Sequence, residues 1–568
     1  MISKKIFIKN KKQLSLDKTR GRLMLLSACF FILYSVVAAR VFDLTVLQGG
    51  VLEEDTSYYG VVGDNNKNLR ADIVDRNGVI LARSLNMPSL YADPKLVSQP
   101  KDVAKELTKI FPDLVYGSVL KRLQEDNRFT WLKRNIEPAE QALVNELGRP
   151  GLSFKYETKR IYPQRELTAH MVGVTGVDAE GLSGVESSFN KLLFEQDKPL
   201  ELTLDVRVQH ILKREIGKTI KLHEAIGGAG VVMDVNTGEV VAIASLPDYD
   251  PYEYNKQKKD SLFNRATLGV YEMGSTFKIF SIAAMIEKDK RNFVKKYDAK
   301  EPIKIGRFRI RDYHPEKRSL SLPEVFVHSS NIGTALMAQE MGAEYLKGFY
   351  KDIGLLNKPN LEISEIGQPM APSTWGDIHT MTASYGHGIA VSPLQLVKAS
   401  APMVNGGYVV EPTLIKGSKK KTYKQSVIGA ETSHRLRELL RLNVSNGTGS
   451  KADVKGYLVG GKTGTAEKPG KGGYDRKKLI SSFLSFFPMD EPKYAVFVMI
   501  DEPKGIKETY GYATGGWVGA PTVARVIASM ASVLGMEPRT ENLNFGDNLL
   551  RYVKTEEQIK RERQIAAH

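Results

Sequence analysis

Three short segments of the chain carry residue types that together could catalyse acyl transfer on a serine. Ser275-Thr276-Phe277-Lys278 offers a serine nucleophile with a lysine one helical turn away, which could act as its base. Ser329-Ser330-Asn331 offers a hydroxyl and an amide that could relay protons. Lys462-Thr463-Gly464-Thr465 offers a cation and hydroxyls that could hold a carboxylate, and Gly464 could let a substrate lie against the strand. The combination predicts a serine acyl-transferase that forms an acyl-enzyme on Ser275.

Taken singly, each segment also has a simpler structural explanation. Ser275 and Ser329 would each serve as a helix N-cap, and the glycines around Lys462 would suit a turn. The Lys-Thr-Gly triplet occurs once in the chain, whereas Ser-x-Asn recurs at 84/86 and 188/190. Ser-x-x-Lys recurs at 15/18, 98/101, 118/121, 188/191 and 418/421. The context of each segment must therefore decide which of them could do chemistry.

The surroundings of Ser275 distinguish it from the other candidates. Gly274 precedes it, and the residues after it (276–288) predict an apolar helix. At a helix start, free N–H groups and the helix dipole favour negative charge on the serine oxygen. Lys278 shares a helix face with Ser275, and an apolar setting lowers the pKa of a lysine. The nearest rival, Ser118, precedes a polar helix, so that its lysine would remain charged.

Turn residues between apolar runs predict the strands that must carry these segments. Asp75-Arg76-Asn77-Gly78 predicts one β-hairpin. Two further hairpins are expected around Asn236-Thr237-Gly238 and around Pro488–Pro492, and Val523–Leu534 predicts an apolar helix. The order of strands, many helices and strands again predicts a multidomain α+β protein, with an antiparallel sheet flanked by helices and a helical subdomain.

The N-terminal region predicts a membrane anchor. Leu23–Ala39 is an uninterrupted run of apolar and small residues, preceded by eight basic residues and one acidic residue. A run of this length is near the lower limit for a transmembrane helix, and the basic flank places the N-terminus in the cytoplasm. The alternative, a signal peptide, is disfavoured by the long basic region and by the absence of small residues at a cleavage site. We expect a basic cytoplasmic arm (1–22), a transmembrane helix (23–42), an α+β pedestal (45–225), a catalytic domain (228–535) and a charged tail (536–568). Within the pedestal, residues 101–148 are expected to be largely helical, and the charged tail is most simply a solvated helix.

Composition excludes several other classes of protein. The chain has 568 residues, of which 42% are hydrophobic and 26% charged, as in ordinary globular proteins. Its single cysteine, Cys29, allows no intramolecular disulfide, and its nine histidines show no metal-ligand spacing, so we expect no metal and no cofactor. Nearly half of the net charge of +16 lies in the first 22 residues and the rest is spread thinly along the chain. We see no clustered basic patch with interleaved aromatic residues and no known nucleic-acid-binding module, so we expect no nucleic-acid partner.

Beyond the three motifs, longer segments resemble the class B penicillin-binding proteins, and most closely the members of that family that act at the division septum. The resemblance covers nearly all of residues 20–535. The segments that carry it are 70–82 (RADIVDRNGVILA), 160–173 (RIYPQRELTAHMVG), 181–186 (GLSGVE), 202–209 (LTLDVRVQ), 264–278 (NRATLGVYEMGSTFK) and 384–395 (SYGHGIAVSPLQ). Met273 stands where the family often has proline, and Arg165 stands where it commonly has glycine.

The resemblance implies a pedestal of the dimerisation-domain type and a transpeptidase domain with the penicillin-binding/β-lactamase fold. It implies that Ser275 is acylated by a D-Ala-D-Ala stem peptide, that Lys278 takes its proton, and that Ser329 and Asn331 relay protons. Lys462, Thr463, Gly464 and Thr465 would bind the terminal carboxylate. Expected partners are peptidoglycan stem peptides, β-lactam antibiotics, the inner membrane, a membrane glycosyltransferase such as FtsW, and other divisome proteins. An elongation enzyme, a DD-carboxypeptidase or β-lactamase, and a β-lactam sensor remain alternatives.

Overall fold

The computed structural model describes residues 24–40, 42, 70–176, 178–290, 292–306, 308–418, 426–470, 473–540, 544–554 and 558–559. The chain divides into two compact units, Met1–Asn68 and Leu69–His568. In the first unit residues 24–40 are helical, whereas the predicted arm 1–22 lies outside the described residues. Across the described ranges, no helix has both the length and the apolar character required to cross a membrane.

The first part of the second unit is a pedestal built on a five-stranded sheet. Its strands are β1 (Ile73–Val74), β2 (Ile80–Ala92), β3 (Thr130–Lys133), β4 (Leu152–Ile161) and β5 (Leu200–Glu201). The order is β3-β2-β1-β5, with β4 pairing antiparallel to β2 along ten residues. The predicted hairpin at Asp75–Gly78 is confirmed, because β1 and β2 pair antiparallel and the Asp75 carboxylate accepts the backbone N–H groups of Asn77 and Val79.

Three helices cover one end of the β2–β4 ribbon. They are α2 (Pro100–Ile110), α3 (Tyr116–Leu123) and α4 (Pro138–Glu146). Their apolar faces share a small core that includes Leu90, Leu107 and Phe111, separate from the larger cores of the chain. The three helices are the segment predicted to be largely helical over 101–148. The pedestal continues with α5 (Ala169–Val172), α6 (Gly184–Ser188) and α7 (Asn190–Glu195).

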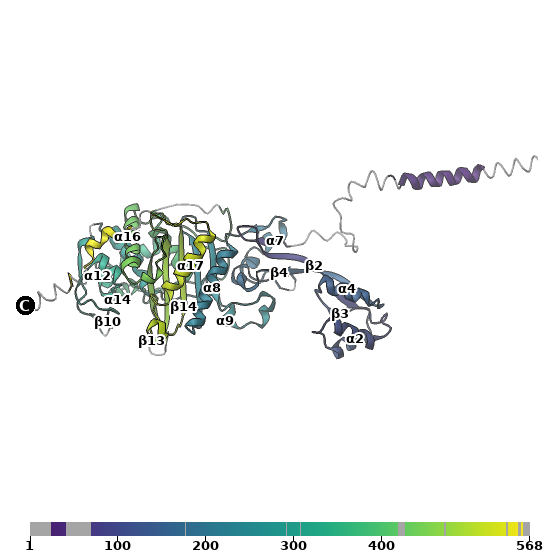
Figure 1. The fold of residues 1–568 in the computed structure, drawn as a ribbon, viewed down its shortest axis with the longest axis horizontal. Helices are drawn as coiled ribbons and strands as arrows, with labels where there is room; N and C mark the ends of the chain where they lie inside the picture. The colour runs from purple at the N-terminus through teal and green to yellow at the C-terminus, as the bar shows by residue number, and fades with distance from the viewer. Residues whose placement is uncertain are drawn as a thin grey trace, which may run out of the picture. The chain divides into compact units, whose positions relative to one another are not determined.

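A second five-stranded sheet forms the centre of the remaining chain. Figure 1 shows β13 and β14 of this sheet at the centre of the larger body. The strand order is β12-β13-β14-β6-β7, and all neighbouring strands are antiparallel. The bounds are β6 (Gly227–Asp234), β7 (Val240–Leu246), β12 (Gly460–Gly470), β13 (Gly473–Phe487) and β14 (Tyr494–Asp501). The hairpins predicted at 236–238 and 488–492 are confirmed as β6–β7 and β13–β14. The middle strand of the sheet is β14, which pairs with β13 on one side and with β6, far earlier in the sequence, on the other.

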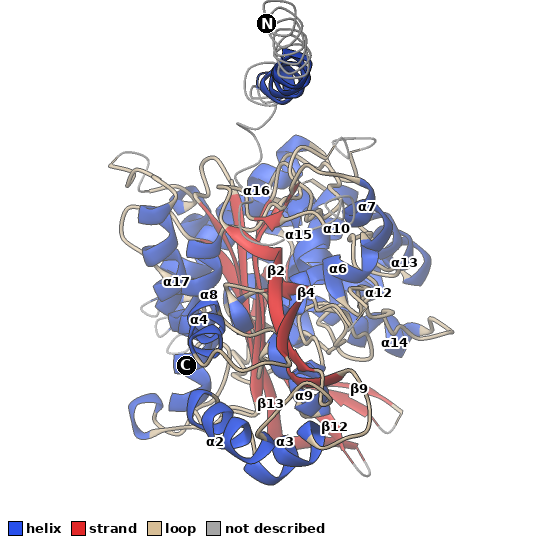
Figure 2. Cartoon of the chain, turned by 90° about the vertical axis from the view of Figure 1, so that its right-hand side faces the viewer, coloured by secondary structure: helices blue, strands red, loops and turns tan. Residues whose placement is uncertain are grey.

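Both faces of this sheet are buried, because successive residues of β14 enter different cores. Val496 and Val498 pack with α8 (Val206–Leu222) and α17 (Gly519–Val533), whereas Ala495 and Phe497 belong to the core on the other face. Figure 2 shows α8 and α17 on one side of the sheet, with α10 (Lys278–Lys288) and α15 (Pro393–Ser400) on the other. The alternation is the period of two expected for a strand. The helix predicted over Val523–Leu534 is confirmed as α17, which begins four residues earlier.

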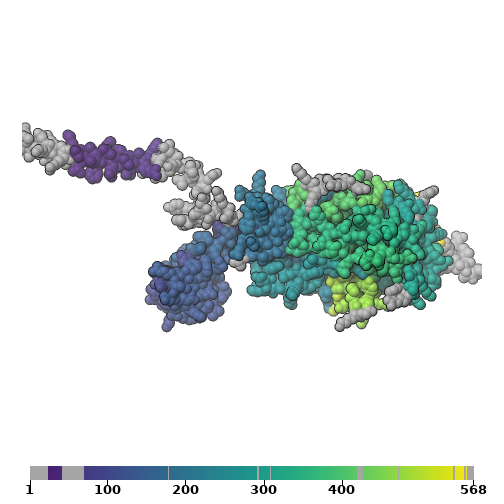
Figure 3. Space-filling view, turned by 180° about the vertical axis from the view of Figure 1, so that it is seen from behind, coloured from purple at the N-terminus to yellow at the C-terminus, as the bar shows by residue number. Residues whose placement is uncertain are grey.

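Helices and short strands between β7 and β12 form the predicted helical subdomain. They are α9 (Lys259–Leu262), α11 (Leu322–Val327), α12 (Asn331–Met341), α13 (Ala343–Asp352), α14 (Asp377–Ala383), α16 (Ala430–Asn446), β8 (Lys296–Asp298), β9 (Ile303–Ile305), β10 (Phe308–Ile310) and β11 (Ser319–Ser321). Figure 3 shows the teal and green residues of this part as one continuous surface. Its core is shared with the base of the pedestal, since Ile73 and Leu202 lie in the same apolar cluster as Phe280 and Leu439.

Two segments do not pack as their predicted domain ranges indicated. The α8 helix lies within the predicted pedestal range 45–225, but it packs on β6, β7 and α17 of the central sheet. The tail after residue 536 was expected to be a solvated helix, and that expectation is wrong for its described part. Leu549 is buried, and the Ser321 hydroxyl donates a hydrogen bond to the Tyr552 carbonyl at 2.7 Å. The tail therefore packs against the catalytic half of the chain.

Candidate active site

The candidate nucleophile lies in a tight turn that leads into a buried helix. Gly274–Phe277 forms one turn of 3₁₀ helix, and α10 begins at Lys278. The sequence predicted that Ser275 would start the helix, and the structure places it in this preceding turn. Gly274 has φ +53°, and a Cβ there would lie 2.4 Å from the Thr465 carbonyl oxygen. Only glycine therefore lets the nucleophile turn approach β12 this closely.

Lys278 is fully buried and directed at the second motif. Its Nζ lies 3.1 Å from the Ser329 Oγ and 2.7 Å from the Asn331 Oδ1, and it also donates to the Ser329 carbonyl. Burial lowers the pKa of Lys278 to about 7, and the negative charge of Asp312 opposes that shift. None of the hydrogen bonds that Lys278 makes within the described chain goes to the Ser275 hydroxyl. The lysine is thus held by the second motif while it lies one turn from the nucleophile.

The second motif is fixed by the start of α12. Ser330 is the N-cap of this helix: its Oγ accepts the Gly333 N–H at 2.9 Å and donates to the Asp312 carboxylate at 2.7 Å. Asn331 Nδ2 donates to the Arg311 carbonyl at 2.9 Å, and this bond directs the amide oxygen of Asn331 towards Lys278. Ser329 adopts φ +57°, a strained value for serine. The N-cap role that was the structural alternative for Ser329 belongs instead to Ser330. The Ser329 hydroxyl therefore contacts Lys278 and Lys462.

Lys462 reaches the same hydroxyl from the sheet. It is fully buried, and its Nζ lies 2.9 Å from the Ser329 Oγ and 3.3 Å from the Thr463 Oγ1. Burial, followed by the charge of Lys278, lowers the pKa of Lys462 well below its usual range. Two lysine amines therefore converge on one serine oxygen, and the protonation of one depends on the other.

Packing within the protein requires glycine at position 464. We expected the absence of a side chain to let a substrate lie against β12. In the structure, a Cβ at Gly464 would lie 2.3 Å from the Ser482 Oγ and 2.7 Å from the Met273 carbonyl oxygen. The close approach is thus made by β13 and by the nucleophile segment. This packing holds Ser275 beside the strand that carries Lys462.

Sequence reasoning missed several residues that orient the motif side chains. Thr463 Oγ1 shares a hydrogen bond of 3.0 Å with the Thr448 hydroxyl, and Thr465 Oγ1 accepts the Gly515 N–H at 3.0 Å. Asp312 was missed as well. These residues lie far from the motifs in the sequence and have no local signature, so only the fold brings them to the site.

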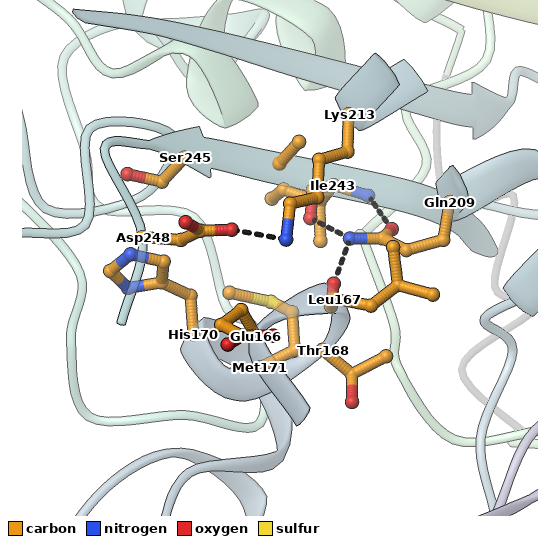
Figure 4. A pocket seen from close by; sticks show the side chains of 11 residues that line it. Glu166, Leu167, Thr168, His170, Met171, Gln209, Lys213, Ile243, Ser245 and Asp248 are labelled. Carbon is orange, nitrogen blue, oxygen red and sulfur yellow. Dashed lines mark hydrogen bonds and ion pairs between the residues drawn. The ribbon is translucent and has the colours of Figure 1, made fainter. Parts of the chain in front are cut away.

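A separate pocket lies at the junction of the pedestal and α8 (Figure 4). Lys213 is paired with Asp248, and the Gln209 amide bridges the Leu167 carbonyl and the backbone of Ile243. Burial lowers the pKa of His170 to about 4, so this imidazole is neutral at physiological pH. The lining contains no nucleophile paired with a base, so we interpret the pocket as a polar packing contact between the pedestal and α8. Elsewhere in the described ranges, no group of three or more His, Cys, Asp or Glu residues is arranged to hold a metal ion.

Comparison with known proteins identifies the class that this fold and site define. The penicillin binding protein transpeptidase domain matches residues 228–528, and the penicillin-binding protein dimerisation domain matches residues 66–193. The chain belongs to the class B penicillin-binding protein family.

Individual relatives agree with this assignment. The chain is 37% identical to the probable peptidoglycan D,D-transpeptidase FtsI of Caulobacter vibrioides, over 84% of each chain. It is 28% identical to the peptidoglycan D,D-transpeptidase FtsI of Escherichia coli, over 93% of this chain and 94% of the relative. A crystal structure of penicillin binding protein 3 from Mycobacterium tuberculosis, complexed with aztreonam, matches with a TM-score of 0.65 at 23% identity and covers 83% of this chain and 97% of that one. This last likeness shows the fold.

Proposed function

We propose that this protein is a peptidoglycan D,D-transpeptidase that cross-links stem peptides at the division septum through an acyl-enzyme on Ser275. The observation that carries the proposal is the convergence of Lys278 and Lys462 on the Ser329 hydroxyl, one turn from Ser275. Three segments separated by more than fifty residues each meet in this one buried cluster. Such a cluster can both deprotonate a serine and pass a proton onward.

In the acylation step, the Ser275 Oγ attacks the carbonyl between the two terminal D-alanines, and its proton passes to the neutral amine of Lys278. The C–N bond then breaks, and the released D-Ala amine receives a proton through the Ser329 hydroxyl. A stem peptide is left esterified to Ser275. In the second step an amine of another stem peptide attacks this ester, its proton returns through the same groups, and the serine hydroxyl is regenerated.

The third motif supplies the binding energy and orientation for this reaction. Lys462 and the hydroxyls of Thr463 and Thr465 hold the terminal carboxylate of the donor. The backbone N–H groups of Ser275 and Thr465 stabilise the oxyanion that develops on the attacked carbonyl. Packing of Gly274 on Thr465 supports this role, because it brings these two backbone segments into contact. Binding and chemistry then share one edge of the sheet.

The cellular setting follows from the relatives and from the N-terminal sequence. Two relatives named FtsI support a septal role. The basic arm followed by the apolar run Leu23–Ala39, within the expected helix 23–42, supports a single span of the inner membrane, an N-terminus in the cytoplasm and a catalytic domain in the periplasm. A membrane glycosyltransferase such as FtsW would supply the glycan strands, together with other divisome proteins. Fluorescence imaging of a tagged copy tests this setting, and sidewall labelling without a midcell band would refute the septal role.

Covalent labelling tests the nucleophile. Ser275→Ala should abolish labelling of the purified protein by fluorescent penicillin. Ser118→Ala is the matched control, because Ser118 begins another Ser-x-x-Lys segment on α3 in the pedestal, and it should label like the parent protein. Retained labelling of Ser275→Ala would refute the assignment. Formation of a cross-linked dimer from amine-bearing stem peptides, rather than hydrolysed monomer alone, separates a transpeptidase from a carboxypeptidase.

A further inference from the structure

The end of the chain returns to the part of the molecule that carries the second motif. After α17 the Arg539 N–H donates to the Gly456 carbonyl at 2.6 Å, and residues 544–554 then lie on α16 and α11. We call residues 544–554 the clasp, which contains the short 3₁₀ helix η11 (Asp547–Tyr552). Figure 1 shows the yellow end of the chain beside α16. The clasp has no role in the reaction described above.

The first half of the clasp is anchored to α16. Gly546 has φ +90°, and a Cβ there would lie 2.8 Å from the Glu438 carbonyl oxygen, so the two backbones are in close contact. Asn548 Nδ2 donates to Glu438 Oε1 at 2.8 Å. Leu549 is buried in the large core, and Phe545 packs against the same core. Backbone, polar and apolar contacts thus fix the clasp to one side of this helix.

The second half of the clasp bonds to the start of α11 through two backbone groups. Ser321 is the N-cap of α11, and Glu324 Oε2 accepts the Ser321 N–H at 2.9 Å to close a capping box. The Ser321 hydroxyl donates to the Tyr552 carbonyl at 2.7 Å, and the Lys554 N–H donates to Glu324 Oε1 at 3.0 Å. Both residues of the capping box are buried. The clasp therefore supplies hydrogen-bond partners that the cap of α11 would otherwise lack.

The position of α11 determines the position of Ser329. The helix has only six residues, Leu322–Val327, and Ser329 lies two positions beyond its end. The Ser329 N–H donates to the Phe326 carbonyl at 3.2 Å. A helix this short, about 9 Å long, moves as one body, so a shift at Ser321 is passed to Ser329. The strained φ of +57° at Ser329 also persists only where surrounding contacts enforce it.

The anchor of the clasp is itself bonded to the strand that carries the third motif. Asn443 of α16 donates from Nδ2 to the Gly461 carbonyl of β12 at 2.7 Å, and Lys462 is the next residue. The clasp therefore connects the helix that positions Ser329 with the helix that holds the strand of Lys462. These two residues meet where the Lys462 Nζ lies 2.9 Å from the Ser329 Oγ.

We propose that the clasp is a positioning element that holds the Ser329 hydroxyl in place for acylation. This proposal rests on the transpeptidation proposed above, because the clasp acts only through the second motif. An error of about 1 Å in the position of a catalytic group can cost about 10² in rate. The clasp contacts named above involve no ligand-binding residue, so loss of the clasp should slow the chemical step more than it weakens ligand binding.

Two truncations of the full-length protein test the proposal, with penicillin as the ligand. The chain that ends at Thr540 lacks the clasp, and the chain that ends at Gln558 keeps it and is the matched control. The dependence of the acylation rate on penicillin concentration gives a dissociation constant and a first-order acylation constant. We expect the first-order constant to fall about tenfold in the shorter chain with little change in the dissociation constant, at a temperature well below both Tm values. The control should match the parent protein.

The Ser329→Ala background separates positioning from general stabilisation. There the removal of the clasp should change the first-order constant less than about twofold, because the group that the clasp positions is already absent. A tail that only stabilised the fold would act equally in both backgrounds. The same tenfold factor in both backgrounds would overturn the proposal, and so would a first-order constant that is unchanged in the chain ending at Thr540.

Two glycine substitutions test the clasp without a deletion. Gly546 and Gly535 have φ values of +90° and +65°, which strain any alanine, but a Cβ at Gly535 would have no atom within 4 Å. Gly546→Ala should lower the first-order acylation constant about threefold by displacing the clasp from α16, and Gly535→Ala should match the parent protein. Equal constants for these two variants would also overturn the proposal. A parent protein that penicillin does not acylate on Ser275 would instead refute the proposed function.

Discussion

The pH dependence of acylation follows from the burial of Lys278. With a pKa of about 7, its neutral and basic form makes up about one tenth of the population at pH 6 and about nine tenths at pH 8. The sign is fixed by the role of a base: the proton must be absent, so the rate rises with pH. We expect the second-order rate constant for acylation by penicillin to increase about tenfold from pH 6 to pH 8 and about a hundredfold from pH 5 to pH 8.

The assay is stopped-flow or quenched labelling with fluorescent penicillin, with thermal unfolding at each pH as the control for folding. Asp312 provides an internal test, because its charge raises the pKa of Lys278. Asp312→Asn keeps the shape of the side chain, and its midpoint should shift to lower pH. A profile that is flat between pH 5 and pH 8, or one with a midpoint near the ordinary lysine value of about 10.4, would refute Lys278 as a base with a lowered pKa.

Three further substitutions test separate parts of the structure. Ser329→Ala should slow penicillin acylation by about 10²- to 10⁴-fold with little change in Tm, since it removes the hydroxyl shared by two lysines; unchanged acylation would contradict the relay. Gly464→Ala should destabilise the protein by about 1–3 kcal/mol in urea unfolding, because its Cβ would lie 2.3 Å from the Ser482 Oγ; full stability would show that the strand can move aside. Glu186→Gln should destabilise by about 3–5 kcal/mol, because it leaves two buried arginines without their shared carboxylate; a Tm within a degree of the parent would contradict this.

Local turn chemistry explains why much of the sheet could be predicted. Asp75 accepts two backbone N–H groups of its own turn, and Asp234 does the same for Asn236 and Thr237. Both turns are determined by residues that are neighbours in the sequence, so their hairpins could be predicted from the sequence. The order of the strands in the central sheet could not be predicted in the same way. β14 pairs with β6 across more than two hundred residues, and no local pattern specifies that contact.

The candidate site was partly predictable for the same reason. Ser275 and Lys278 are close in sequence, and the apolar residues after them signal burial of the lysine. Asp312 carries no such signal, because an isolated acidic residue in a sequence is most often solvated. Gly464 is another such case, because the atoms that crowd its position come from β13 and the nucleophile segment. Contacts between distant segments are what sequence patterns leave out.

We expect substrate binding to keep Lys278 in its neutral form, which is the form that acts as the base. In the free protein, burial lowers the pKa of both Lys278 and Lys462, whose amines share the Ser329 oxygen. A donor carboxylate beside Lys462 favours its charged form, and a charged Lys462 in turn disfavours a proton on Lys278. Occupation of the carboxylate site thus keeps the base neutral when the carbonyl arrives. The methyl ester of a penicillin lacks this charge, so the pH midpoint of its first-order acylation rate constant, measured at saturating ligand, should lie at higher pH than that of the free acid. Identical midpoints for the ester and the acid would show that the two lysines titrate independently of the ligand.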